Sequence, residues 1–263
     1  MDRFKKISPL DMSEFFVRED ELDVFEPGYW NLPIPWISTF IFTHISAQFW
    51  GYNDFDKNPN PYDKPRVLQI GCAQGGDAVE NAKILKLPMI NGELHVIDWF
   101  KGNLTVDEEE EWYYKENNAP IWRNHLESEA KKFNVLDRIT IFEGDSREMI
   151  HKVKDNYYDI VFIDGGHEYD IVKSDIEHGY KKLKPNGIMV LDDFSGGPDA
   201  YQRFDVKNAT PEMIEKDTWS FNGEKIHVGV VKAVHEFFNG NYIVCGSHDK
   251  VYHMKGYNIK REI

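Results

Sequence analysis

Residues 67–79 read VLQIGCAQGGDAV, and this stretch decides the fold. An apolar run leads into glycines, and the glycines lead directly into a segment with helical spacing. Gly71 permits a sharp turn, while Gly75 and Gly76 let a ligand approach the backbone where a helix N-terminus presents free N–H groups. The stretch predicts a strand, a ligand-binding turn and a helix, although a tight strand-to-helix connection would also use such glycines.

Strand-like runs alternate with helical patterns from residue 66 to residue 194. The apolar runs are RVLQIG, ELHVID, RITIFEGD, YDIVFID and GIMVLDD, and segments such as DAVENAKILKL and PIWRNHLESEAKKFN separate them. Nearly continuous apolar strands are expected where helices cover both faces of a sheet. Farther on, HVGVVKAVHEFF predicts a helix, and NYIVCG with KVYHMKG predicts a closing hairpin. The fold class is therefore α/β, with a doubly wound, mostly parallel, seven-stranded Rossmann-like sheet.

Composition excludes several classes of protein. The 263 residues carry a formal net charge of -14, so a nucleic-acid partner is not expected, because binding phosphates requires a basic surface. Only two cysteines are present, Cys72 and Cys245, which indicates a reducing compartment. The sequence shows neither a leader nor an apolar run long enough to cross a bilayer. We expect a cytoplasmic protein without a membrane partner.

Acidic residues end the predicted strands. Asp98 ends the second strand, where a carboxylate can accept from both ribose hydroxyls of a nucleoside. Asp145 follows the third strand, where it can accept from an exocyclic amine. Asp164 ends the fourth strand, and an aspartate pair, 192–193, ends the fifth. Packing alone does not explain so many carboxylates beside a core, so the pattern favours a nucleotide-type cofactor site.

The order of GCAQGG, VIDWF, FEGDS, FIDGGHEYDIVKSD and LKPNGIMVLDD resembles the class I S-adenosylmethionine-dependent methyltransferases. Within them it is similar to the metal-dependent small-molecule O-methyltransferases that modify sugars and natural products. The resemblance spans roughly residues 64–240. It implies S-adenosylmethionine as cofactor, bound by Gln69, Gly71, Ala73, Gly75, Asp98, Trp99, Asp145, Ser146 and Asp164. Gln69 stands where the family usually has an acidic residue, and Ala73 replaces the usual middle glycine.

A metal site is expected at Asp164, Asp192 and Asp193. Adjacent strands lie about 4.8 Å apart, so carboxylates that end neighbouring strands can converge. Crowded carboxylates need a cation, and oxygen ligands favour Mg²⁺, or Mn²⁺. The resemblance implies the same three ligands. As alternatives, Asp164 would cap the following helix and the aspartate pair would belong to a turn.

His167 is the expected catalytic base. A hydroxyl that binds the cation loses its proton more readily, and a nearby imidazole can take that proton near neutral pH. The family analogy leaves the identity of the base open. Catechol-type relatives carry lysine at the spacing of His167, and some sugar-modifying relatives carry a carboxylate where this chain has Gly166. A hydrogen bond from His167 to a backbone carbonyl is the structural alternative.

Two segments are expected to flank the acceptor. Residues 1–64 form an N-terminal aromatic and helical extension, which would serve as a lid or as a contact in a homo-oligomer. Residues 65–263 form the cofactor-binding catalytic domain, in which 195–227 is a long loop for the substrate. That loop holds polar groups suited to a polyhydroxylated acceptor, namely Tyr201, Arg203, Lys207 and His227.

The expected function is Mg²⁺-dependent methyl transfer to a hydroxyl of a small polar acceptor. By analogy with the family, this acceptor is a sugar or sugar nucleotide of a capsule or natural-product pathway. One alternative is a metal-independent small-molecule methyltransferase in which His167 acts alone. Another is a non-catalytic nucleotide-binding module with the same fold. Chelation of the metal distinguishes the metal-dependent from the metal-independent methyltransferase. A cofactor titration followed by a turnover assay identifies a non-catalytic module.

Overall fold

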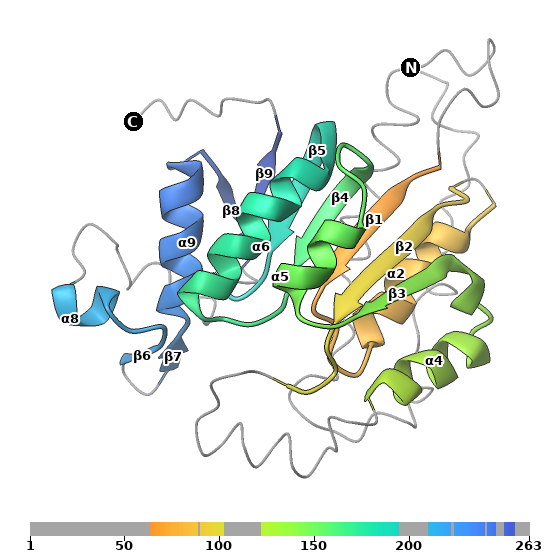
Figure 1. The fold of residues 1–263 in the computed structure, drawn as a ribbon, viewed down its shortest axis with the longest axis horizontal. Coiled ribbons are helices and arrows are strands. Elements are labelled where there is room, and N and C mark those ends of the chain that lie inside the picture. The colour runs from red at the N-terminus through yellow and green to blue at the C-terminus, as the bar shows by residue number, and fades with distance from the viewer. Residues whose placement is uncertain are drawn as a thin grey trace, which may run out of the picture.

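The computed structural model describes residues 64–88, 90–102, 122–194, 210–221, 224–239, 241–245 and 250–255. Seven strands form one sheet in the order β3-β2-β1-β4-β5-β9-β8 (Figure 1). Their bounds are β1 (Arg66–Ile70), β2 (Glu93–Asp98), β3 (Ile139–Glu143), β4 (Tyr158–Ile163), β5 (Leu183–Leu191), β8 (Ile243–Cys245) and β9 (Lys250–Met254). Strands β1 to β5 pair in parallel, and β9 runs antiparallel to β5 and β8. The predicted sheet and its closing hairpin are confirmed.

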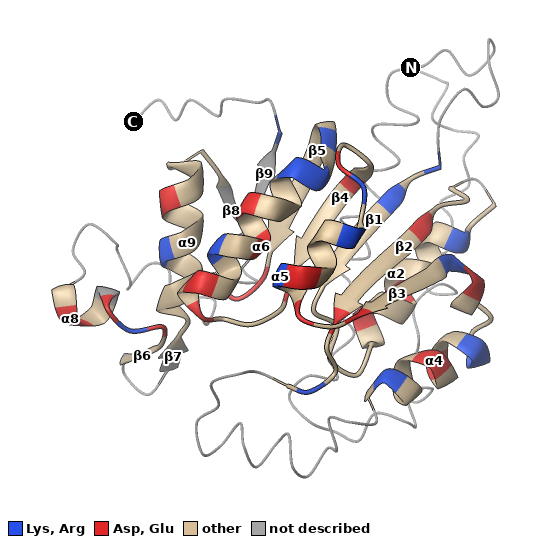
Figure 2. Cartoon of the chain, viewed as in Figure 1, with Lys and Arg blue, Asp and Glu red and all other residues tan. Residues whose placement is uncertain are grey.

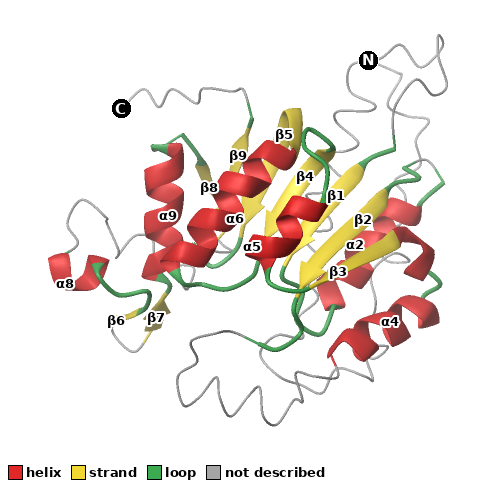
Figure 3. Ribbon diagram, in the orientation of Figure 1, coloured by secondary structure: helices red, strands yellow, loops and turns green. Residues whose placement is uncertain are grey.

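Helices cover both faces of the sheet (Figure 3). On one face, α2 (Gly76–Lys86) and α4 (Trp122–Lys132) contribute to one buried apolar cluster. On the other, α5 (Ser146–Met149), α6 (Tyr169–Lys182) and α9 (Val228–Phe238) contribute to a second. Short 3-10 turns, η5 (Leu136–Arg138) and η6 (Ile150–Lys152), complete the connections. The fold is therefore doubly wound, as the sequence predicts.

The pleat of β4 explains its continuous apolar sequence. Every residue of β4 is buried. Ile160 and Phe162 face the cluster of α2 and α4, whereas Val161 and Ile163 face the cluster of α6 and α9. Successive side chains of a strand point to opposite faces, so a strand with helices on both sides needs apolar residues throughout.

Part of the predicted substrate loop has regular structure. It contains α8 (Pro211–Ile214) and a small antiparallel pair, β6 (Trp219–Phe221) and β7 (Glu224–Ile226). Thr210 caps α8, because its hydroxyl accepts from the backbone N–H of Met213 at 3.3 Å. Residues 195–209, with Tyr201, Arg203 and Lys207, lie outside the described residues, as do residues 1–63 of the predicted extension.

Acidic residues gather in the loops at the arrowhead end of the sheet, around the start of α5 (Figure 2). Ligands of open α/β sheets bind at this end of the sheet, outside the carboxyl ends of the strands. No helix of the described ranges combines the length and the apolar character needed to cross a membrane.

Candidate active site

A pocket opens at the carboxyl ends of β1, β2 and β4. It spans about 650 Å³, counting its open mouth. Its lining comes from the segments that follow these strands and β3, and from the starts of α4, α5 and α6: Ile70, Gly71, Cys72, Ala73, Ile97, Asp98, Trp99, Gly102, Trp122, Gly144, Asp145, Ser146, Asp164, Gly165, Gly166 and Ile171.

The turn between β1 and α2, which contains Gly71 and Gly75 and is called the glycine turn below, lies against the loop that follows β4. Gly71 has a φ of 83°, and a Cβ there would lie 1.9 Å from the carbonyl oxygen of Asp164. The same two loops are joined by a 2.7 Å hydrogen bond from the backbone N–H of Asp164 to the carbonyl of Ile70. Only glycine fits this position, because both the backbone conformation and the close approach exclude a side chain.

Gly75 has a structural role. It begins α2 with a φ of 93°, and a Cβ there would lie 2.6 Å from the Leu126 side chain on α4. Gly75 is absent from the pocket lining, whereas Ala73, in a left-handed conformation with a φ of 46°, contributes to it. Packing of α4 onto the turn thus requires Gly75, while Ala73 presents its backbone to the pocket.

Gln69 lies behind the turn and outside the pocket lining. Its side chain is fully buried. The amide nitrogen donates to the carbonyl of Gly71 at 3.1 Å and to the Asp77 carboxylate at 3.3 Å, while the amide oxygen accepts from Asn81 at 3.2 Å. These bonds tie β1, the turn and α2 together. The side chain is used within the protein, whereas the resemblance implied a contact with the cofactor.

Asp98, the last residue of β2, holds the glycine turn in place. One carboxylate oxygen accepts from the backbone N–H groups of Cys72, at 2.7 Å, and Ala73, at 3.1 Å. The other accepts from the N–H of Phe100 at 2.6 Å. Burial raises the pKa of the Asp98 carboxyl, and the three backbone donors oppose that shift. The carboxylate faces the pocket on its remaining side.

Asp145 and Ser146 form the third part of the pocket. Asp145 caps α5, because its carboxylate accepts from the backbone N–H of Arg147 at 2.9 Å. The Arg147 guanidinium also pairs with this carboxylate, and it lowers the pKa of the Asp145 carboxyl. An adenine amine would therefore compete with Arg147 for Asp145.

A buried carboxyl lies beneath the pocket. Asp175, on α6, is 1% exposed, and both oxygens of its carboxyl are buried. A Cβ on Gly165, which lines the pocket, would lie 3.7 Å from one of them. Burial raises the pKa of Asp175 to about 7, against a smaller opposing effect of the Ser146 hydroxyl.

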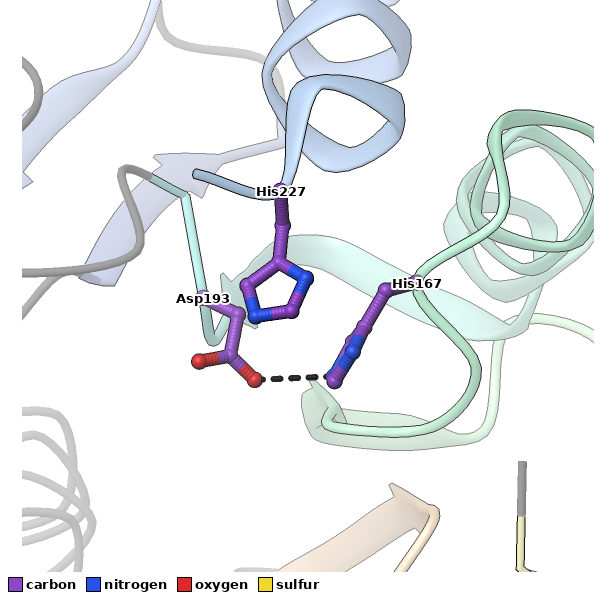
Figure 4. Close-up of side chains that lie close together, drawn as sticks. All are labelled: His167, Asp193 and His227. Atoms are coloured by element: carbon purple, nitrogen blue, oxygen red, sulfur yellow. Dashed lines mark ion pairs between the residues drawn. The ribbon is translucent and has the colours of Figure 1, made fainter. Parts of the chain in front are cut away.

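The predicted metal ligands are not gathered together. Within the described ranges, the group of three metal-ligating side chains found within 4.8 Å of one another is His167, Asp193 and His227, not the three aspartates (Figure 4). Asp164 lines the pocket. Asp192 accepts from the backbone N–H of Asp193 at 2.8 Å.

Seven predicted cofactor residues line the pocket together: Gly71, Ala73, Asp98, Trp99, Asp145, Ser146 and Asp164. Gln69, Gly75 and the predicted base His167 do not. Sequence reasoning missed Trp122 and Ile171 as lining residues, because an apolar residue at a helix start carries no signal of ligand contact. Cys72, which also lines the pocket, is 5% exposed, and burial raises the pKa of its thiol.

The fold and the pocket agree with what known proteins show. Residues 68–194 match a family model described as a methyltransferase domain. No curated protein matches the chain. The O-methyltransferase NovP is 13% identical, with 84% of this chain and 80% of NovP covered and a TM-score of 0.57.

Two further structures share the fold. Cofactor-bound Rv0187 from MTB is 12% identical, covers 85% of this chain and 83% of its own, and has a TM-score of 0.51. A protein from Corynebacterium glutamicum is 11% identical, with 86% of this chain and 83% of that protein covered and a TM-score of 0.52. The family match includes the glycine turn, all the strand ends of the pocket and the aspartates after β5. Residues 68–194 thus match a methyltransferase domain, and the solved structures share its fold.

Proposed function

We propose that the protein transfers a methyl group from S-adenosylmethionine to a hydroxyl of a small polar acceptor. The observation that carries this proposal is the pocket within the methyltransferase domain, where Asp98 holds the glycine turn in place and contributes to the lining. A nucleoside bound there would place its ribose hydroxyls at Asp98. The solved neighbour NovP is an O-methyltransferase, which supports oxygen as the accepting atom.

The residues that line the pocket support binding of the adenosine half of the cofactor. They include two tryptophans, Trp99 and Trp122, and the polar pair Asp145 and Ser146. The Trp99 ring is fixed by a hydrogen bond from Nε1 to the carbonyl of Gly102 at 2.5 Å. Flat apolar walls with a few convergent polar groups suit a nucleoside.

Metal dependence is part of the proposal, but the side chains that the structure brings together differ from the three aspartates expected as metal ligands. Mg²⁺ prefers an all-oxygen octahedron, and the structure gathers two imidazoles with one carboxylate. The residues that come together therefore do not fit Mg²⁺. The Nε2 atom of His167 lies 2.9 Å from a carboxylate oxygen of Asp193, so as a base the neutral imidazole would donate this N–H to Asp193 and accept the proton at Nδ1.

The acceptor is proposed to be a sugar or sugar nucleotide. This choice rests on the sequence resemblance to sugar-modifying enzymes. The test is to incubate the protein and S-adenosylmethionine with panels of sugar nucleotides and of phenols, and to follow methylated products by mass spectrometry. Parallel reactions contain EDTA.

Methylated sugar nucleotides, formed by the wild type and not by Asp98→Asn, are the expected result. Turnover that survives EDTA would point to the metal-independent methyltransferase. A folded protein that binds cofactor and methylates nothing in either panel would count against the proposed acceptor class.

A further inference from the structure

We infer that His167, Asp193 and His227 form a binding site for a divalent transition-metal ion of the Zn²⁺ type. Their potential ligand atoms all lie within 4.8 Å of one another. The Nε2 atom of His167 is 2.9 Å from a carboxylate oxygen of Asp193, and the two imidazole rings have centroids 4.1 Å apart. Figure 4 shows the three side chains pointing toward a common space.

Three separate elements supply these side chains. His167 lies in the loop between β4 and α6, Asp193 follows β5, and His227 directly precedes α9. Asp193 has a φ of 54°, a left-handed conformation that is uncommon outside glycine. Its backbone N–H bonds to the Asp192 carboxylate, which holds the turn. Backbone in such a conformation is kept where the surrounding structure requires it, often at functional sites.

The start of α9 is pressed against the loop of His167. A Cβ on Gly229 would lie 2.4 Å from the carbonyl oxygen of His167 and 2.7 Å from the backbone nitrogen of Tyr169. Asp217 joins the same segments, because its carbonyl accepts from the N–H of Gly229 at 2.9 Å and its carboxylate accepts from the N–H of Tyr169 at 2.8 Å. The packing of α9 against α6 thus fixes His227 beside His167.

The donor set selects the kind of ion. Two imidazoles with one carboxylate are ligands that proteins use for Zn²⁺ and for non-haem Fe²⁺, whereas Mg²⁺ takes oxygen ligands. Metal bonds of about 2.1 Å place neighbouring ligand atoms about 2.9 to 3.5 Å apart. The pair of His167 and Asp193 already has this separation. The third ligand atom, on His227, lies within 4.8 Å of both.

The charge of the cluster also differs from that of three aspartates. Three carboxylates at one point repel one another unless a cation is bound. Two neutral imidazoles and one carboxylate carry a single negative charge, so the site can exist before the metal arrives. This matches the structure, in which Asp193 turns toward the two histidines.

The site is partly open and lies next to the cofactor pocket. The side chains of His167 and Asp193 are 15% and 21% exposed, while His227 is 7% exposed. Gly166, which precedes His167 in the chain, lines the pocket. Three protein ligands with an open side are typical of metal sites that also bind a substrate. That the open side takes the acceptor hydroxyl rests on the proposed function, and His167 is then a ligand, not the base.

Co²⁺ is the probe for this site, because its visible absorption reports the ligand field. Metal is removed from the full chain with a chelator, and Co²⁺ is titrated into the wild type and into His227→Gln, Asp193→Asn and Asp164→Asn. His235→Gln is the matched control, since His235 is a histidine of α9 outside the cluster. Binding of S-adenosylhomocysteine, measured on each variant, reports folding and the proposed function separately.

The wild type should bind one Co²⁺, with absorption bands that excess Zn²⁺ removes and excess Mg²⁺ does not. His227→Gln and Asp193→Asn should weaken Co²⁺ binding at least about 10-fold, while Asp164→Asn and His235→Gln leave it unchanged. Loss of binding in Asp164→Asn with wild-type binding in His227→Gln would overturn the inference in favour of the three aspartates. A wild type that takes up S-adenosylhomocysteine but shows no Co²⁺ bands would also overturn it.

Discussion

The glycine turn and the histidine–aspartate cluster are built in different ways, although both lie at the same edge of the sheet. The turn is held by residues of β1, α2 and β2 that bond to one another, with Asp98 and Gln69 as the main partners. The cluster brings together residues 167, 193 and 227 from three separate loops, the last of which leads into α9. A site of the first kind is readable from a local motif, and one of the second kind depends on tertiary packing.

The largest effect is expected for Gly71→Ala. The added methyl would collide with the Asp164 carbonyl in a left-handed backbone, so we expect a loss of about 2–5 kcal/mol in the free energy of unfolding. Urea unfolding measures this loss. Gly76→Ala is the control, because a Cβ there meets nothing within 4 Å. Equal stability of the two variants would mean that the turn is not a rigid part of the fold.

Asp175→Asn should change the pH dependence of stability. In the unfolded chain the carboxyl ionises near a pH of about 3.9, while burial raises its folded pKa to about 7. The unfolded state therefore releases the proton first, and the wild type loses stability as pH rises from about 4 to 7. Asparagine does not ionise, so its advantage over the wild type should grow across that window.

The gain above neutral pH has an upper bound of about 4 kcal/mol. Unfolding by urea across a pH series measures it, and Asp170→Asn, an exposed carboxylate on the same helix, is the control. Parallel pH profiles for Asp175→Asn and the wild type would show that the buried carboxyl carries no such shift.

Gly229→Ala should disturb the histidine–aspartate cluster without affecting the glycine turn. Its methyl would collide with the carbonyl of His167 and move α9 away from the cluster, at a cost of about 1–3 kcal/mol in stability. Co²⁺ binding should weaken, because His227 moves with α9, while the affinity for S-adenosylhomocysteine stays close to that of the wild type. If both ligands lost affinity equally, the two regions would not be independent.

The smallest effect is expected for Arg147→Gln. The pair of Asp145 and Arg147 is largely exposed, and such pairs are worth about 0–1 kcal/mol. Removing Arg147 frees Asp145 for an adenine amine, so S-adenosylhomocysteine should bind up to about 5-fold more tightly. Calorimetry at fixed ionic strength measures the change. Weaker binding in the variant would mean that Arg147 itself contacts the ligand.

The sequence predicted the sheet because its strands are apolar on both faces, as in β4, and it predicted the turn because Gly71 and Asp98 belong to one motif. The expected contact of Gln69 with the cofactor came from the family resemblance, whereas in the structure this buried side chain bonds to Asp77 on α2. The cluster could not be predicted from the sequence, because His227 is far from His167 in the chain. The packing of Gly229 against the loop of His167 and the hydrogen bonds of Asp217 to both segments bring them together.

The central claim is that the pocket beside Asp98 binds S-adenosylmethionine. Calorimetric titration of S-adenosylhomocysteine into the metal-free wild type and into Asp98→Asn tests it most directly. We expect saturable binding at one site in the wild type, weakened about 10- to 100-fold in the variant, because the carboxylate then no longer accepts from both the turn and the ribose. A folded wild type that does not bind S-adenosylhomocysteine, or a variant that binds it equally well, would contradict the claim.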